Sequence, residues 1–371
     1  MIRITDPTQC CGCSACSAAC PHGAISMVAD GMGFRYPVID PQRCTDCGAC
    51  EKVCSFHPAD VPPAAQAEAI RFPELLDQSQ SGGLAYALMR KATQKGYTVY
   101  GAALDKDFVV RHRRVTDEPG LEPLRLSKYV QSDLDGIPQR VQDDLQAGRQ
   151  VLFTGTPCQC AGVASLAGGR RNQLLLADII CHGVPSPAVW SAFLKDKEKR
   201  HGRKLTGALF RDKALGWHDH RETLLFGDEK VVSNEYTFLF YRHLMFRPAC
   251  TLCPFASLRR PSDLTMADCW GVEQALPGFA DDNRGCSLLM VHTEAGKAFS
   301  EEFPDVCVRT AIPVPTEKQP NLYTPSLPHK KADVFRRVFL HRGYAAAWKR
   351  FSPESRGYRL EKLIEKVKRH L

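Results

Sequence analysis

The sequence predicts a small cysteine-rich α+β module, a larger α/β domain with a partly parallel sheet, and a helical C-terminal tail. Nine of the 17 cysteines lie before residue 55, in two tight repeats. Between residues 84 and 201, helical and strand patterns alternate, which is typical of an α/β sheet. Residues 331–371 have mostly helical spacing. We therefore expect the module over residues 1–56, the larger domain over 79–325 and the tail over 326–371.

The two cysteine repeats share the form C-x2-C-x2-C-x3-C, which is the spacing of bacterial two-cluster ferredoxins. In that arrangement, three cysteines of one run and the last cysteine of the other run hold one 4Fe–4S cluster. The first thiol set is therefore Cys10, Cys13, Cys16 and Cys54, and the second thiol set is Cys44, Cys47, Cys50 and Cys20.

Zinc is the alternative metal for these cysteines, but zinc sites usually show two C-x2-C pairs separated by a longer gap. Pro21 follows the first run, whereas Ser55 follows the second, which departs from the usual proline. Cys11 belongs to neither set, and we expect a packed thiol beside a cluster. Two neighbouring clusters carry single electrons, so we expect a converter to two-electron steps within residues 80–371.

Hydrophobic patterns after residue 56 predict the helices and strands of the larger domain. Residues 57–78 are rich in Pro and Ala, and we expect a linker there. Helices are predicted at 84–95, 137–147, 159–167 and 187–201. Strands are predicted at 97–104, 108–115, 150–154 and 173–180, with further strands near 205–211, 222–226 and 230–233.

Composition and charge limit the location and partners that we expect. Neither a run of 18 apolar residues nor a signal peptide is recognisable, so we expect a cytoplasmic protein with reduced thiols. The formal net charge of +8 is concentrated after residue 328, where thirteen Lys and Arg stand against four Asp and Glu. The rest of the chain is nearly neutral and predicts no binding to nucleic acid.

Four segments of the larger domain have residue types suited to chemistry. Ser81-Gly82-Gly83 precede a helix, where backbone amides can approach an anion, although a simple helix cap is the alternative. TGTPCQ at 154–159 and CHGVPS at 181–186 each follow an apolar strand, at the usual ligand edge of an α/β sheet. The fourth segment begins with Cys250-x2-Cys253 and leads to DLTMADCWG at 263–271.

These segments, together with FRDKALGW at 210–217, occur in one characteristic order. In that order the sequence resembles the beta subunit family of coenzyme F420 hydrogenases and dehydrogenases, over about residues 80–310. A ferredoxin module in front is a common attachment in that family. The resemblance implies an oxidoreductase in which FAD converts between two-electron and one-electron steps. Its hydride partner would be coenzyme F420 or another organic substrate.

The resemblance also implies which residues lie at the flavin. Asp268 matches the acidic position of the family segment and is expected in the flavin or substrate pocket. Cys269, however, stands where the family pattern has an aromatic residue. No residue is assigned a catalytic role. The expected flavin residues are Ser81, Gly82, Gly83, Ser127, Lys128, Tyr129, Thr154, Gly155, Thr156 and Asp268.

Four further cysteines stand in the family motifs, and together they would bind a third 4Fe–4S cluster that extends the path to the flavin. The alternative is that they are buried free thiols. His182 is expected to donate a hydrogen bond beside this cluster. The third thiol set is Cys158, Cys181, Cys250 and Cys253, whereas Cys160, Cys269, Cys286 and Cys307 are expected to be structural.

The charged segment at 210–217 would bind an acidic substrate or the flavin phosphates through Arg211 and Lys213. A solvated turn formed with Asp212 and Trp217 is the alternative. His218 and His220 are spaced for a metal, but two histidines alone are weak support for one.

The tail has the pattern of an amphipathic basic helix. We expect this helix to dock on the body with its charged face in solvent, and the alternative is contact with a membrane surface or a partner. The apolar face comprises Leu360, Leu363, Ile364, Val367 and Leu371.

The expected function is electron relay between a small redox carrier or partner redox subunit, the clusters and FAD. FAD would exchange hydride with an organic donor or acceptor. The alternatives are a non-catalytic electron-transfer subunit of a larger complex and an iron–sulfur redox sensor or scaffold, which the absence of a DNA-binding motif disfavours.

Overall fold

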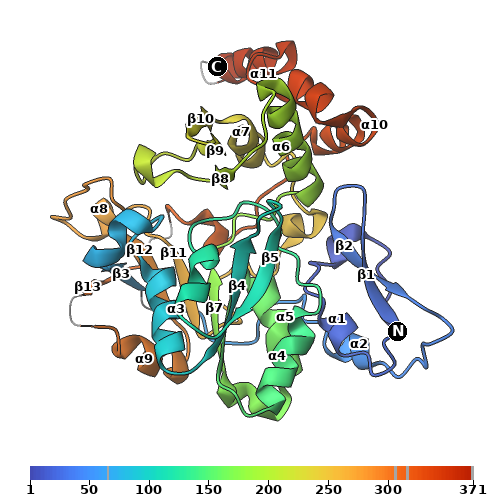
Figure 1. Ribbon diagram of the computed structural model, residues 1–371, viewed down its shortest axis with the longest axis vertical. Helices are drawn as coiled ribbons and strands as arrows, with labels where there is room; N and C mark the ends of the chain where they lie inside the picture. Colours follow the sequence, from blue (N-terminus) through green and yellow to red (C-terminus); the bar gives the residue numbers. More distant parts are fainter. Residues whose placement is uncertain (65–66, 305–306, 315–316, 369–371) are drawn as a thin grey trace.

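The computed structural model describes residues 1–64, 67–304, 307–314 and 317–368. It contains a front module, a central eight-stranded sheet with helices on both faces, and an upper layer that includes the C-terminal helices (Figure 1). Among the described helices, none is long and apolar enough to cross a membrane. The expected arrangement of a ferredoxin-like module followed by an α/β domain with a mixed sheet is confirmed.

The front module is a short antiparallel hairpin flanked by two one-turn helices. Each helix starts directly after a residue in the left-handed region, Ser14 (φ 63°) and Gly48 (φ 73°), so each cysteine run curls before it becomes helical. The module comprises η1 (Pro7–Gln9), α1 (Ala15–Ala18), β1 (Ile25–Ala29), β2 (Arg35–Ile39) and α2 (Ala49–Lys52).

The central sheet has the strand order β13-β3-β12-β11-β7-β6-β4-β5. The pairs β4–β6, β6–β7 and β7–β11 are parallel, and the remaining pairs are antiparallel. The strands are β3 (Ala67–Arg71), β4 (Thr98–Leu104), β5 (Val110–Val115), β6 (Val151–Gly155), β7 (Leu174–Ile179), β11 (Leu264–Asp268), β12 (Ser287–Val291) and β13 (Val308–Ile312).

Helices cover both faces of this sheet because its inner strands are apolar on both sides. On one face, α4 and α5 pack over Phe153 and Leu176. On the other face, α3 and α9 pack over Leu152 and Leu175. The elements around the sheet are η2 (Pro73–Gln78), α3 (Leu84–Gln94), η3 (Pro119–Leu124), α4 (Ile137–Gln146), α5 (Pro157–Ala167), η4 (Gly168–Gln173), η6 (Pro248–Leu252), α8 (Val272–Ala275), α9 (Glu294–Glu301) and η7 (Pro320–Leu322).

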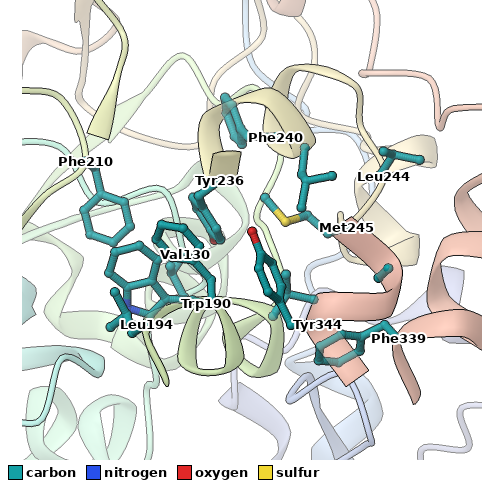
Figure 2. Close-up of a cluster of buried hydrophobic side chains, with 14 of the residues drawn as sticks. Val130, Trp190, Leu194, Phe210, Tyr236, Phe240, Leu244, Met245, Phe339 and Tyr344 are labelled. Atoms are coloured by element: carbon teal, nitrogen blue, oxygen red, sulfur yellow. The ribbon is translucent and has the colours of Figure 1, made fainter. Parts of the chain in front are cut away.

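The upper layer is built on a separate three-stranded sheet of order β10-β9-β8. Its aromatic core is shown in Figure 2, where Trp190 stacks on Phe210 at 4.3 Å and meets Tyr236 edge-on at 4.9 Å. Met32 and Phe34, from the turn between β1 and β2, are buried in the same core. The layer comprises α6 (Pro187–His201), β8 (Gly207–Leu209), η5 (Lys213–Leu215), β9 (Glu222–Phe226), β10 (Glu229–Ser233), α7 (Glu235–Tyr241), α10 (Ala332–Phe351) and α11 (Arg356–Lys368).

Two expectations about the ends of the larger domain are wrong. Residues 67–71, expected within a linker, form β3, which lies inside the sheet between β13 and β12. Helix α11 does contact the body, through Tyr358 and Glu361, but the expected apolar face is not the docked one, because Leu360, Leu363 and Ile364 are exposed. Of the expected apolar face, the side chain of Val367 and the whole of Leu371 lie outside the described residues.

Candidate functional site

The carboxyl ends of the parallel strands gather the predicted site residues at one edge of the sheet. Strands β6, β7 and β11 run parallel and adjacent, so their last residues lie side by side. Thr154–Thr156 end β6 and begin α5, Cys181 follows β7, and Asp268 ends β11. Loops at this edge of an α/β sheet are where ligands usually bind.

The third thiol set comes together just beyond this edge. Burial raises the pKa of Cys181, and the charges of Cys250, Cys158 and Cys253 raise it further, which means that these thiols are near neighbours. Cys158 is the second residue of α5, whose first turn is held by a capping box between Thr156 and Gln159. Cys250 accepts a hydrogen bond from the backbone N–H of Val184 at 3.4 Å.

The first and second thiol sets are also assembled as the spacing predicted. Burial, followed by the charges of Cys13, Cys10 and Cys54, raises the pKa of Cys16 to about 12. The second set lines a small cavity of about 20 Å³, and Cys47 in this set is exposed. The backbone N–H groups of Ile2 and Ala24 donate to Cys50 Sγ and Cys20 Sγ, each at 3.3 Å.

The three sets need not converge on one metal position to hold 4Fe–4S clusters. Within the described part of the chain, no three His, Cys, Asp or Glu side chains meet around one metal position. A 4Fe–4S cube does not require this, because each thiolate binds a different iron at its own corner. The cysteines are free thiols, and N–H donors to their sulfurs are a common feature of cluster sites.

Cys11 connects the first and third sets. Its thiol is buried and hydrogen-bonds to Cys13 and to Cys158, one from each set, and these contacts raise its pKa. Cys13 also packs on α5, because a Cβ added to Gly162 would lie 2.8 Å from Cys13 Sγ. The expectation of a packed thiol beside a cluster is therefore too narrow, since Cys11 lies between two sets.

A polar group centred on Asp268 lies at the same edge as the third set. Arg211 Nη1 and Trp217 Nε1 donate to the two carboxylate oxygens of Asp268 at 2.7 and 2.8 Å. Arg211 is only 2% exposed, and Trp217 stacks on Trp270 at 4.6 Å. The solvated-turn alternative is therefore wrong for Arg211 and Trp217.

Two of the expected flavin residues, Ser127 and Tyr129, join this group. Burial raises the pKa of the Tyr129 phenol, whereas the neighbouring Arg211 and Ser127 act to lower it. Ser81 is close to Trp217, because a Cβ added to Gly285 would meet both Ser81 Cα, at 2.9 Å, and Trp217 Cδ1, at 3.1 Å.

Close packing requires glycine at positions 82 and 83, whether or not a ligand binds there. A Cβ on Gly82 would overlap the backbone oxygen of Ile70, and one on Gly83 would lie 2.9 Å from Leu75 Cβ. The neighbouring Ser79 Oγ and both amide atoms of Gln80 are buried without a hydrogen-bond partner. These orphaned atoms, like Arg211 Nε, suit a polar ligand.

Lys128 lies near the end of β6 without an ion-pair partner in the described chain. Burial lowers the pKa of its ammonium to about 7, and its charge in turn helps to lower the pKa of His112, which contacts Thr154 O at 2.9 Å. Its Nζ donates to Arg125 O. Thr154 Oγ1 itself donates to Tyr100 O at 3.1 Å, so this hydroxyl is already engaged.

A cavity of about 520 Å³ lies elsewhere, between the front module, β5 and α6. Gly12 and Arg35 line it from the module, and Trp190 lines it from α6. None of the ten expected flavin residues lines this cavity. The case for a flavin at the strand edge therefore depends on unpaired polar groups and not on this cavity.

Of the three histidines considered, His182 does not behave as expected. Both ring nitrogens of His182 are engaged, with Asn321 Oδ1 at 3.0 Å and His243 Nε2 at 2.8 Å, so it is not a donor to the neighbouring cluster site. His218 pairs with Asp281, and His220 pairs with Tyr241, so these two histidines do not form a metal site within the described residues. Sequence spacing carried no signal for these partners.

Residues 148–310 match the family model for the C-terminal part of the coenzyme F420 hydrogenase/dehydrogenase beta subunit, and residues 9–57 match the 4Fe-4S dicluster domain. Both parts of the expected resemblance are therefore confirmed. A chain of the F420-reducing NiFe hydrogenase complex from Methanosarcina barkeri is similar in structure, with a TM-score of 0.47 and 16% identity over 78% of this chain and 91% of that chain. No curated protein sequence matches.

Proposed function

Over residues 148–310 the chain belongs to the coenzyme F420 hydrogenase/dehydrogenase beta subunit family, and on that premise we propose that it is an iron–sulfur flavoprotein oxidoreductase. It would relay electrons between a one-electron carrier and an organic hydride partner through three 4Fe–4S clusters and FAD. The observation that carries the proposal is the order of the thiol sets, from the second set with its exposed Cys47 to the third set at the strand edge that also carries the Asp268 group.

The first and second sets would hold the two outer clusters. Cys47 is exposed, which favours the second set as the place where a one-electron carrier approaches. The first set lies further in, and Cys11 joins it to the third set through two thiol contacts. Buried sulfur-to-sulfur contacts of this kind shorten the path that an electron has to cross.

The Asp268 group would hold the flavin and its partner. FAD, when bound, would supply the exchange between two-electron and one-electron steps. Arg211 is positioned by Asp268 and Tyr129, and it would present a fixed positive charge to the flavin or to an acidic substrate. Lys128 would pair with a flavin phosphate, which would compensate its otherwise unpaired ammonium.

The proposal is tested by anaerobic purification followed by measurement of iron and released flavin. We expect about twelve irons, four for each cluster, and about one FAD per chain. Cys158→Ala should lose about four irons, whereas Cys160→Ala, in the same helix, should keep about twelve. About eight irons in the wild-type protein, with no flavin, would contradict the proposal.

A second candidate is a non-catalytic electron-transfer subunit of a larger complex. The exposed Cys47 favours it, as does the match to a family of beta subunits, which act within assemblies. Reduced F420 and other hydride donors should be mixed anaerobically with the flavin-loaded chain while flavin absorbance is recorded. Bleaching would support the oxidoreductase. Intact flavin absorbance with every donor, together with stable co-purification of another redox protein, would support the second candidate.

A further inference from the structure

We infer that Arg247 is a positioning residue whose fixed positive charge, placed between the first and third thiol sets, raises the reduction potentials of both clusters. This inference rests on the proposed function, because it requires that both sets hold clusters. Arg247 was not singled out by any sequence motif, since it precedes the Cys250-x2-Cys253 pair by three residues.

The backbone of Arg247 is part of the third-set loops. Its N–H donates to Val184 O at 2.9 Å, and its carbonyl accepts from the N–H of Cys250 at 3.0 Å. Val184 N–H in turn donates to Cys250 Sγ. Backbone hydrogen bonds alone therefore hold Arg247 against a ligand loop of the third set.

The side chain of Arg247 crosses to the front module. Nε donates to Cys10 O at 2.7 Å, and Nη2 donates to Arg35 O at 2.8 Å. Nη2 also lies 3.6 Å from Cys10 Sγ, a ligand of the first set. One guanidinium group thus joins the cysteine loop of the first set to the ligand loop of the third set.

The surroundings of Arg247 hold its guanidinium in one place. It is 1% exposed, and it lies over the Tyr36 ring at 4.3 Å. Gly12, with φ +75°, leaves the required space, because a Cβ there would be 2.7 Å from Arg247 Nη1. Gln131 accepts from Nη1 at 3.0 Å and donates to Cys11 O at 2.9 Å.

No carboxylate forms an ion pair with Arg247 among the residues that the structure describes. Its guanidinium instead lies against the cysteine loop of the first set, with Nη2 at 3.6 Å from Cys10 Sγ, while its backbone carbonyl holds the N–H of Cys250 in the third set. The cation is therefore fixed between the two sets.

Reduction adds one negative charge to a cluster that four thiolates already make anionic. A fixed cation a few ångströms away favours that reduced state, and the attraction is stronger inside protein than in water. Removing the charge should therefore lower the reduced fraction of each cluster at a fixed potential. The expected change in the reduced-to-oxidised ratio is on the order of tenfold to a hundredfold, for a separation of about 6 to 12 Å between the guanidinium and the cluster charge and an effective dielectric constant near 20.

The experiment is an anaerobic redox titration of the cluster-loaded protein, followed by electron paramagnetic resonance. Wild type, Arg247→Met and Arg247→Lys are compared, with Arg242→Met as the control, since Arg242 pairs with Glu361 in the tail. We expect lower midpoints for both clusters in Arg247→Met, midpoints closer to wild type in Arg247→Lys, and no change in the control.

Iron content is measured on every sample before titration. Unchanged midpoints in fully loaded Arg247→Met would overturn the inference and leave Arg247 with a purely structural role. If Arg247→Met does not assemble its clusters, Arg247→Gln, which keeps an amide donor but no charge, gives the same comparison. A wild-type protein with about eight irons would instead contradict the proposed function, which separates the two failures.

Discussion

We predict that Lys128 makes the proposed binding of FAD sensitive to pH. Burial lowers the pKa of its ammonium from 10.5 to about 7, so about half of the flavin-free molecules carry this charge at pH 7. A flavin phosphate against Lys128 would favour the ammonium and raise its pKa in the complex. Binding would then require that Lys128 be protonated.

The sign of the pH effect follows from this difference in pKa. Below about pH 7, Lys128 is charged with and without FAD, and the affinity is constant. As the pH rises above 7, the flavin-free protein must take up a proton to bind, so Kd rises by about tenfold per pH unit. The rise ends at the pKa of the complex, where the stabilisation is lost.

Replacing Lys128 with Met removes the ammonium charge and keeps a long, unbranched side chain. We expect the variant to bind FAD more weakly at pH 6 by roughly 10- to 100-fold, because a charge-assisted hydrogen bond contributes about 1.5–3 kcal/mol. The pH dependence above 7 should also disappear. Both effects can be measured by titrating FAD into deflavinated, cluster-loaded protein between pH 6 and 9, with quenching of flavin fluorescence as the readout.

Lys106→Met serves as the control, since Lys106 is exposed and borders the separate cavity beside β5. The control should keep both the affinity and the slope of wild type. A wild-type affinity that does not change between pH 6 and 9, or an equal slope in Lys128→Met, would refute the assignment of Lys128 to a flavin phosphate.

Three further predictions concern stability and are measured by denaturant unfolding. Asp268→Asn should lower the free energy of unfolding by about 1.5–3 kcal/mol, because the buried Arg211 loses its counter-charge; an unchanged midpoint would contradict this pairing. Gly82→Ala should cost about 3 kcal/mol through its clash with a backbone oxygen, whereas Gly169→Ala, which meets no atom within 4 Å, should be nearly neutral. Leu363→Glu should change stability by less than about 0.5 kcal/mol, since this side chain is 58% exposed, and a larger loss would mean that the Leu363 face of α11 packs against the body.

Short-range patterns in the sequence predicted much of the fold. Helix α6 begins and ends as expected at Pro187 and His201, because Ser186 caps it and Gly202 ends it in the left-handed region. The first two thiol sets follow from the fixed spacing of ferredoxin ligands, and the third set follows from the family motifs, while their role as cluster ligands stays a prediction. The structure brings the members of each predicted set close together.

Long-range pairing was not predictable in the same way. Strand β3 has the sequence AEAIR, whose weak alternation is hidden by the Pro- and Ala-rich residues before it. Only its neighbours β12 and β13, which follow it by more than 200 residues, make it a strand of the sheet. The contact of Arg247 with Cys10 is also long-range, across 237 residues, so no local sequence pattern predicted it.

The contact between Gly162 and Cys13 affects whether the larger domain can be separated from the front module. Helix α5 begins at Pro157, next to the proposed ligand Cys158, and lets the front module approach only because Gly162 has no side chain. The module also fills the upper core with Met32 and Phe34. A fragment without residues 1–56 would therefore expose a bare stretch of helix and an emptied core. The front module is therefore an integral part of the fold. A larger domain without it would need other side chains to cover the surface of α5 at Gly162 and to fill the upper core.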